Sequence, residues 1–167
     1  PIREKSLLRF GQDPLLLAQL KNYQQFGFEE AIIVGNPANK QDIEDLLQSL
    51  DMKTHVVVQP EPIGMGDAIL KAAPILQDRL DTPIYINQVH DVVDNRLHER
   101  VLKAHKKRGD ETLLAGREMQ DYFPGGYLVV DDKERITGIL EKPGPENRPS
   151  NLVNIVAHLH AHAGRLF

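Results

Sequence analysis

Short apolar runs alternate with amphipathic segments along the first two thirds of the sequence. Runs such as 31–34, 54–58 and 84–87 have the length and the β-branched residues that are typical of buried strands. Between them, apolar residues recur at helical spacing, and helices are expected from Pro14 to about Gly27, after Asn39, over 67–80 with an interruption at Pro74, and over 95–107. This alternation predicts an α/β fold with a mainly parallel central sheet.

The final third of the chain is richer in strand-forming runs. A β-hairpin is predicted there, because two apolar runs flank a polar turn at 131–134. A proline-rich loop over 143–149 then leads to the last apolar run. The strands expected in this part cover 126–130, 136–140 and about 153–159, and a strand over 112–115 is expected just before it.

We interpret the chain as one domain over 1–167, with a βαβ part over 1–120 and a β-rich part over 121–167. In an open α/β sheet, ligands bind beyond the carboxyl ends of the strands. The residues that directly follow each expected strand are therefore the candidates for chemistry.

Composition excludes several classes of protein. The chain has no cysteine, which rules out a disulfide framework and thiolate chemistry. Its 24 acidic and 20 basic residues are spread along the whole length, so no basic patch indicates nucleic acid. The apolar runs are far shorter than a membrane span. We expect a cytoplasmic protein with small-molecule partners and neither nucleic acid nor membrane, and its oligomeric state, a homo-oligomer included, stays open.

The segment 59–68 follows an expected strand and opens an expected helix. Gly64 and Gly66 allow its backbone to approach a flat ligand closely, while the amide of Gln59 can donate to and accept from the edge of a nucleobase. A nucleobase slot is one interpretation. An ordinary strand-to-helix turn is the other, because short glycine motifs are weak evidence.

Two further positions carry charge at the ends of expected strands. Asp91 follows the run 84–87, where a carboxylate can hold Mg²⁺; the alternative is a helix cap or a solvated turn residue. Asp94 is the second choice for this ligand, and Asn95 is expected to compete for the capping role. The pair Glu141 and Lys142 suits a sugar phosphate, because carboxylates accept from hydroxyl groups and lysine supplies a positive charge; the alternative is a surface ion pair.

Taken in order, the strings Gln59-Pro-Glu-Pro-Ile-Gly64, His90-Asp91 and Glu141-Lys142-Pro143 resemble those of the sugar-1-phosphate nucleotidylyltransferases, from about Lys5 to about Leu159. The resemblance implies a Rossmann-like nucleotide-diphospho-sugar transferase fold, magnesium dependence, and reaction of a nucleoside triphosphate with a sugar 1-phosphate. The site residues that it implies are Gln59, Gly64, Met65 and Gly66 at the nucleotide, Asp91 at the metal, Lys5 at the phosphates, and Gly126, Glu141, Lys142 and Asn154 at the sugar phosphate.

The chain departs from this family pattern in several places. Histidine stands at position 90 where the family has glycine, and Gly126 lacks the preceding tyrosine. The Gly-x-Gly-x-Arg loop and the second metal-binding aspartate of the family are not in these residues, so the resemblance implies a chain incomplete at both ends and inactive by itself. A non-catalytic nucleotide-sugar-binding or regulatory relative and a glycosyltransferase are the alternative functions.

Three histidines, His158, His160 and His162, alternate along the last expected strand. Alternation places them on one face, a spacing that suits a transition metal. A polar strand face or a subunit contact is the more common explanation, and we base no function on them.

Overall fold

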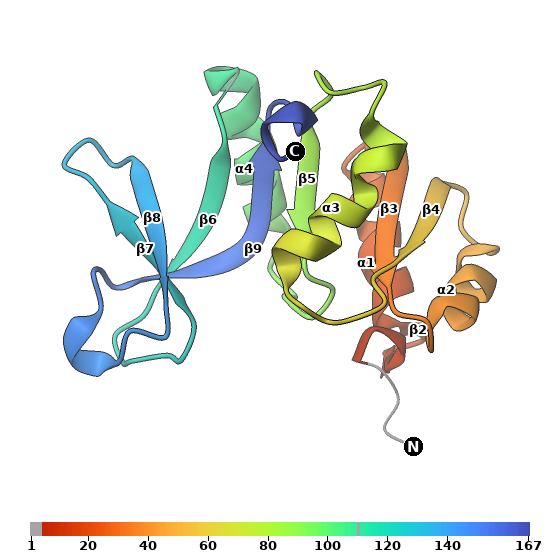
Figure 1. Ribbon diagram of the computed structural model, residues 1–167, viewed down its shortest axis with the longest axis horizontal. Coiled ribbons are helices and arrows are strands. Elements are labelled where there is room, and N and C mark those ends of the chain that lie inside the picture. The colour runs from red at the N-terminus through yellow and green to blue at the C-terminus, as the bar shows by residue number, and fades with distance from the viewer. Residues whose placement is uncertain (1–4, 110) are drawn as a thin grey trace.

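The computed structural model describes residues 5–109 and 111–167 (Figure 1). Its α-helices are α1 (Leu15–Gln25), α2 (Lys40–Leu47), α3 (Met65–Leu76) and α4 (Asn95–Arg108), and its 3₁₀ turns are η1 (Lys5–Leu7), η2 (Pro145–Asn147) and η3 (Ala163–Arg165). Its strands are β1 (Arg9–Phe10), β2 (Asp13–Pro14), β3 (Glu30–Gly35), β4 (Lys53–Val58), β5 (Ile84–Asn87), β6 (Leu113–Glu118), β7 (Gly126–Val130), β8 (Ile136–Glu141) and β9 (Leu152–His160).

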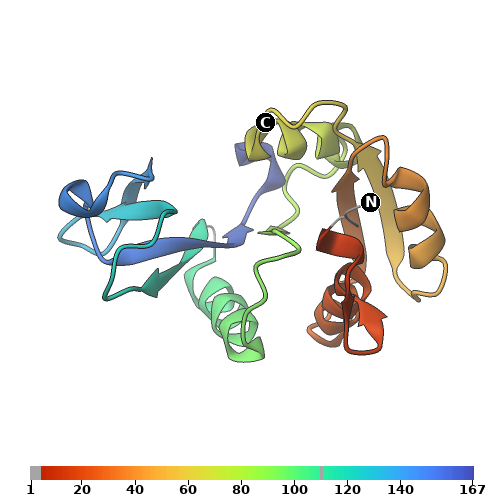
Figure 2. The same cartoon turned by 90° about the horizontal axis from the view of Figure 1, so that it is seen from below.

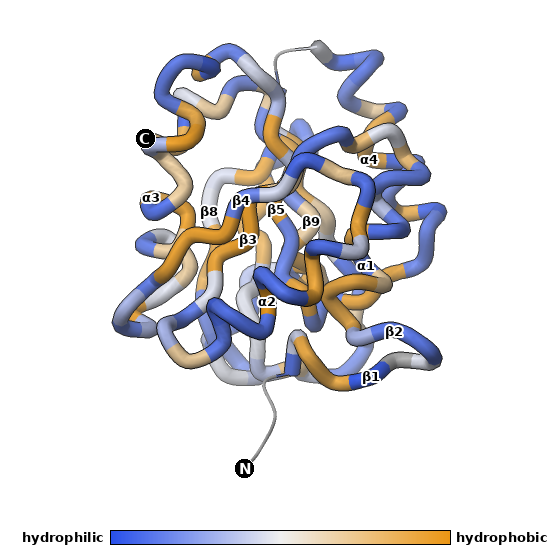
Figure 3. Tube along the Cα trace, turned by 90° about the vertical axis from the view of Figure 1, so that its right-hand side faces the viewer, coloured by the Kyte–Doolittle hydropathy of each residue, from blue (hydrophilic) through white to orange (hydrophobic). Residues whose placement is uncertain are grey.

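Strand β3 is covered on both faces because its side chains alternate between two apolar clusters. Ala31 and Ile33 pack against a cluster that α1 and α2 supply through Leu16, Leu20, Ile43 and Leu47. Ile32 points the other way and packs against Ala72 and Leu76 of α3. Figure 3 shows the mostly apolar strands β3 and β4 with α3 on one side and α1 on the other.

Strands β3 and β4 form a parallel ladder over their whole length, from Glu30 opposite Lys53 to Gly35 opposite Val58. The backbone N–H of Gln59 extends this pairing by donating to the Gly35 carbonyl at 2.8 Å. The two carboxyl ends therefore lie side by side, and the predicted nucleotide loop begins at that edge.

A second, five-stranded sheet is built around β9. Leu159 pairs with Tyr85 of β5 and with Leu113 of β6, so these two strands lie along opposite edges of β9. Val153 pairs in the same way with Arg117 of β6 and Tyr127 of β7. All of these ladders are antiparallel, and β8 joins the sheet through β7.

The predicted α/β class is confirmed, whereas among the strands of residues 5–109 and 111–167 parallel pairing is confined to β3 and β4, so the sheets are not mainly parallel. Apolar periodicity reveals where a strand lies but not the direction of its neighbour. Strand β9 follows the β7–β8 hairpin and runs back along β5, which makes the second sheet antiparallel.

Helix boundaries differ from the sequence prediction in detail. Helix α1 begins at Leu15, with Pro14 in the N-cap position, and Asp13 instead forms an ion pair with Lys21 at 2.7 Å. Helix α3 ends at Leu76 and passes through Pro74, which it contains near its last turn. These differences follow from local hydrogen bonding, which apolar spacing does not encode.

The helices lie on both sides of the strand layer (Figure 2). Helix α3 covers one side, and α1 and α4 cover the other, while the β7–β8 hairpin projects from the end of the five-stranded sheet. Over residues 5–109 and 111–167, no helix has both the length and the apolar character needed to cross a membrane.

Candidate active site

Gly126, Glu141 and Asn154, which we call the β7–β9 cluster, come together where the hairpin meets β9. Gly126 lies directly opposite Glu141 in the β7–β8 ladder. A Cβ atom built on Gly126 would lie 3.2 Å from Glu141 Oε2 and 3.8 Å from Asn154 Cβ. Three residues that the sequence predicted for one ligand therefore surround the same small space.

Lys142 extends this cluster toward solvent. Its φ of 44° turns the chain out of β8, and its backbone N–H donates to the Gly125 carbonyl at 3.1 Å. The Lys142 Nζ atom lies 3.8 Å from Glu141 Oε1, and both side chains are more than 60% exposed, at 65% and 68%. A pair this exposed contributes little to stability, which leaves both charges available to a ligand.

Asp91 lies in the turn after β5 and is held by β9. Its Oδ2 atom accepts the backbone N–H of Val156 at 3.1 Å, and its Oδ1 atom lies 3.9 Å from His90 Nε2. The β6–β9 register shifts between Leu113 and Ala115, next to this point. Because Val156 is two residues beyond Asn154 on β9, the strand links Asp91 to the β7–β9 cluster.

Asp94, the second choice for a metal ligand, is engaged elsewhere. It is the N-cap of α4, and its carboxylate accepts from both the backbone and the guanidinium of Arg96. These hydrogen bonds from Arg96 lower the pKa of Asp94 to about 2. The expectation that Asn95 would take the capping role is therefore wrong, because Asn95 is already the first helical residue.

The loop after β4 is ordered by the side chain of Gln59. Its Nε2 atom donates to the Gly64 carbonyl and to Asp67 Oδ2, both at 2.9 Å. Gly64 has a φ of 126°, which residues with a side chain rarely adopt. With Nε2 engaged inside the loop, recognition of a base by this amide would use Oε1.

The rest of this loop is open to solvent. Met65 is 38% exposed, and a Cβ built on Gly66 would meet no atom within 4 Å. The amide of Gln88, just after β5, approaches Met65 Sδ at 3.8 Å. That contact connects the Gln59 loop to the segment that carries Asp91.

Lys5 belongs to the turn η1, with an exposed side chain. Two residues along the chain, Leu7 packs against the apolar cluster that also includes Val89, in the segment between β5 and Asp91. Leu7 and Val89 thus border the same apolar cluster, but none of the described contacts joins Lys5 to Asp91.

The three alternating histidines do not act as a unit. His158 and His160 share one face of β9 with ring centroids 6.4 Å apart, whereas His162 lies beyond the strand, 3.7 Å from Asp81. Burial and the neighbouring His160 lower the pKa of His158, and burial lowers the pKa of His160. Within the described ranges, no three His, Cys, Asp or Glu side chains are grouped so as to hold a metal ion.

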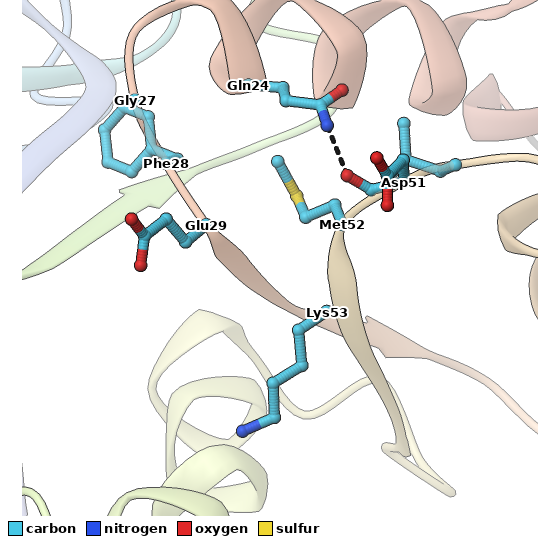
Figure 4. A pocket seen from close by; sticks show the side chains of 8 residues that line it. Gln24, Gly27, Phe28, Glu29, Asp51, Met52 and Lys53 are labelled. Atoms are coloured by element: carbon cyan, nitrogen blue, oxygen red, sulfur yellow. Dashed lines mark hydrogen bonds between the residues drawn. The ribbon is translucent and has the colours of Figure 1, made fainter.

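A shallow pocket of about 540 Å³ lies elsewhere, at the amino ends of β3 and β4 (Figure 4). Gln24 lies at its rim and donates to the Asp51 carbonyl, and Phe28, Glu29 and Lys53 line it. Ligands of open α/β sheets bind at the carboxyl ends of the strands, so this pocket lies at the wrong edge for the predicted chemistry.

The structure also reveals residues that the sequence analysis had not assigned to the site. The backbone N–H of Val156 anchors Asp91, Gln88 contacts Met65, and His158 bonds to Asn154. The sequence carried a signal for two of them, because Gln88 directly follows an expected strand and His158 is a polar side chain inside an apolar strand, but it carried none for Val156.

The chain is similar in sequence to known proteins. Residues 2–159 match the family described as Nucleotidyl transferase. Mannose-1-phosphate guanyltransferase of Aspergillus oryzae is 26% identical over 146 residues, which cover 83% of this chain and 39% of the relative. Mannose-1-phosphate guanylyltransferase 1 of Arabidopsis thaliana is 22% identical over 143 residues, with the same coverage of 83% and 39%. The chain thus spans about two fifths of the length of these curated relatives.

Among solved structures, a UDP-glucose pyrophosphorylase complexed with UDP-glucose is similar in fold. The TM-score is 0.77 at 21% sequence identity, and the match covers 93% of this chain and 67% of that one. Because the family match takes in nearly the whole sequence, the chain belongs to the nucleotidyl transferase family.

Proposed function

We propose that the protein containing this chain joins a nucleoside triphosphate to a sugar 1-phosphate, giving a nucleotide sugar and pyrophosphate. The observation that carries the proposal is the convergence of Gly126, Glu141 and Asn154 on a strand that also anchors Asp91. Sugar-side and phosphate-side candidates are thereby fixed to one rigid element, which is the arrangement that transfer between two bound substrates requires.

In the proposed reaction, an oxygen of the sugar phosphate attacks the α-phosphorus of the triphosphate in line. A new P–O bond forms, the bond between the α-phosphorus and the bridging oxygen breaks, and pyrophosphate leaves with the bonding electrons. No covalent bond to the protein is needed, so the side chains act by positioning substrates and neutralising charge.

The sugar-side roles follow from the chemistry of the β7–β9 cluster. Glu141 would accept hydrogen bonds from sugar hydroxyls, and the amide of Asn154 would donate to the sugar or its phosphate. Lys142 would offset the phosphate charge. The absent side chain of Gly126 lets the Glu141 carboxylate lie close to its backbone, where even a methyl group would crowd that carboxylate.

The nucleotide-side roles are assigned to the Gln59 loop, with the backbone of Gly64, Met65 and Gly66 facing the base. Lys5 would contact the phosphates. These assignments rest on the ordered loop geometry and on the link from Met65 to the segment after β5.

Asp91 fits a magnesium ion. Oδ2 accepts the Val156 N–H, so Oδ1 is the oxygen that would hold the ion, and Mg²⁺ commonly takes one or two carboxylates together with substrate phosphates. When bound, the ion would neutralise charge on the phosphate oxygens.

A pyrophosphate-release assay on the whole protein tests the proposal. The substrate panel pairs several triphosphates with several sugar 1-phosphates, including GTP with mannose 1-phosphate and UTP with glucose 1-phosphate, the pairs suggested by the names of the similar proteins. We expect release that depends on both substrates and on Mg²⁺. Failure of every pair would exclude the proposed reaction.

A second candidate, a relative that binds a nucleotide sugar without turnover, is favoured by one observation. The imidazole of His90 stands 3.9 Å from Asp91 Oδ1, in the space around the proposed metal ligand. Calorimetry together with the pyrophosphate-release assay separates the candidates, because this relative would bind a nucleotide sugar and yet release no pyrophosphate with any substrate pair.

A further inference from the structure

His158 lies in the interior of the molecule on the same face of β9 as Asn154. It is 6% exposed, and its Nε2 atom is 2.9 Å from Asn154 Oδ1. The two residues are four positions apart in β9, and the strand is irregular between them, where its pairing with β6 shifts register between Ile155 and Leu159. The bond thus joins a buried ring to a side chain of the β7–β9 cluster.

The protonation of this pair follows from its chemistry. An amide oxygen only accepts, so the Nε2 atom of His158 must carry the proton. Burial lowers the pKa of the imidazole, which is consistent with a neutral ring that donates from this nitrogen. Asn154 Oδ1 is therefore occupied from the interior, and Nδ2 is the end of the amide that remains for a ligand.

Asn154 is also fixed from the opposite side. Its Cβ lies 3.8 Å from the position that a Cβ on Gly126 would take, next to the Glu141 carboxylate. An unrestrained asparagine amide turns readily about its last torsion, and it can present either oxygen or nitrogen to a ligand. The bond to His158 removes that choice.

We infer that His158 is a positioning residue for the sugar phosphate: it holds the Asn154 amide so that Nδ2 faces the sugar phosphate bound at the β7–β9 cluster. The inference rests on the proposed function, because it assigns the sugar phosphate to this cluster. His158 itself touches no substrate and acts through Asn154.

His160 provides a matched comparison on the same strand face. Its ring is partly buried and packs 6.4 Å from that of His158, but its Nδ1 atom faces Thr112 Oγ1 at 3.4 Å instead of Asn154. Replacing His160 therefore perturbs the same stretch of β9 without breaking the bond to the amide.

The decisive experiment compares His158→Leu, His158→Gln, His160→Leu, Asn154→Ala and the double variant His158→Leu with Asn154→Ala, all in the whole protein. We expect His158→Leu to raise the KM for the sugar 1-phosphate by about five- to tenfold, the effect of one lost hydrogen bond, and to leave the KM for the triphosphate unchanged. Glutamine, whose Nε2 can reach the same oxygen, should restore the KM to within about twofold of wild type.

The double variant separates positioning from packing. If His158 acts through Asn154, then His158→Leu adds nothing once Asn154 is alanine. Effects that multiply in the double variant, an equal rise in both KM values, or a loss in His160→Leu as large as in His158→Leu would each overturn the inference.

Nuclear magnetic resonance can test the positioning role of His158 without measuring turnover. The side-chain amide resonances of Asn154, assigned by their loss in Asn154→Ala, should shift in His158→Leu and return in His158→Gln. Unchanged resonances in His158→Leu would refute the positioning role. If the resonances shift in His158→Leu and return in His158→Gln, but the protein releases no pyrophosphate, only the proposed reaction would be refuted.

Discussion

Gly126 and Glu141 face each other across the β7–β8 ladder, at a distance that leaves no room for a side chain on the glycine. A Cβ at position 126 would lie 3.0 Å from Ile139 Cγ2 and 3.2 Å from Glu141 Oε2. Gly126→Ala should therefore displace the carboxylate, and overpacking of about 1–3 kcal/mol would weaken sugar 1-phosphate binding by about tenfold. Steady-state KM values measure this effect.

Gly138→Ala is the control for that change. Position 138 lies in β8, the strand that carries Glu141, and a Cβ there would meet only Val129, at 3.8 Å or more. Binding of the sugar phosphate should stay within about twofold of wild type. If Gly126→Ala and Gly138→Ala weaken sugar 1-phosphate binding equally, the effect would come from a general disturbance of the β7–β8 hairpin and not from crowding beside Glu141.

Asp91→Asn tests the proposed metal ligand while keeping the fold. The asparagine oxygen can still accept the Val156 N–H, so the melting temperature should stay close to that of wild type. Turnover dependent on Mg²⁺ should fall by about 100-fold or more, because the charge that holds the ion is removed. An unchanged kcat would show that another residue holds the metal.

Gln59→Leu should loosen the loop that is proposed to bind the base. The substitution removes the donor to Gly64 and to Asp67, two bonds worth about 1 kcal/mol each, and the KM for the triphosphate should rise by about tenfold or more. The KM for the sugar phosphate should not change. Gln24→Leu, which removes an amide at the remote pocket of Figure 4, should affect neither KM.

Acid stability should depend on Glu30. Hydrogen bonds from Arg79 lower its pKa from 4.5 to about 2, so the folded protein releases this proton more readily than the unfolded chain. The stabilisation is present above about pH 4.5 and is lost as pH falls toward 2. Glu30→Gln should lower the free energy of unfolding by about 1 kcal/mol at pH 7 and flatten its decline with acid, as urea unfolding would measure.

Glu44→Gln is the matched control for that pH series. Glu44 forms an exposed i,i+4 pair with Lys40 at 3.3 Å, which should contribute no more than about 0.5 kcal/mol. If both variants lower the free energy of unfolding equally, the bidentate contact between Arg79 and Glu30 stabilises the fold no more than an exposed ion pair does.

The strands were largely predictable from the sequence because each is a compact apolar run. The structure has β5 over Ile84–Asn87 and β7 over Gly126–Val130, as expected. Their directions were not predictable, since the pairing of β9 with β5 joins residues about seventy positions apart through no local signal. The division at residue 120 and the cytoplasmic location stay predictions.

The site was predictable where its geometry is local. Gly126 and Glu141 lie in the two arms of one hairpin, so their spacing in sequence already implies that they meet. The anchoring of Asp91 by Val156 could not be foreseen, because it depends on a backbone N–H in a strand 65 residues away. The bond between His158 and Asn154 joins two residues of one strand, yet which polar face turns inward depends on the finished sheet.

The position of β9 also determines the order in which this domain can be completed. It pairs with β5, β6 and β7, yet all three precede it along the chain. During synthesis, those strands leave the ribosome before their common partner exists, while β3 and β4 can already pair with each other. The edges of β5, β6 and β7 that pair with β9 therefore stay unpaired until β9 has been synthesised. The time until β9 pairs with them should determine how much of the newly made protein aggregates.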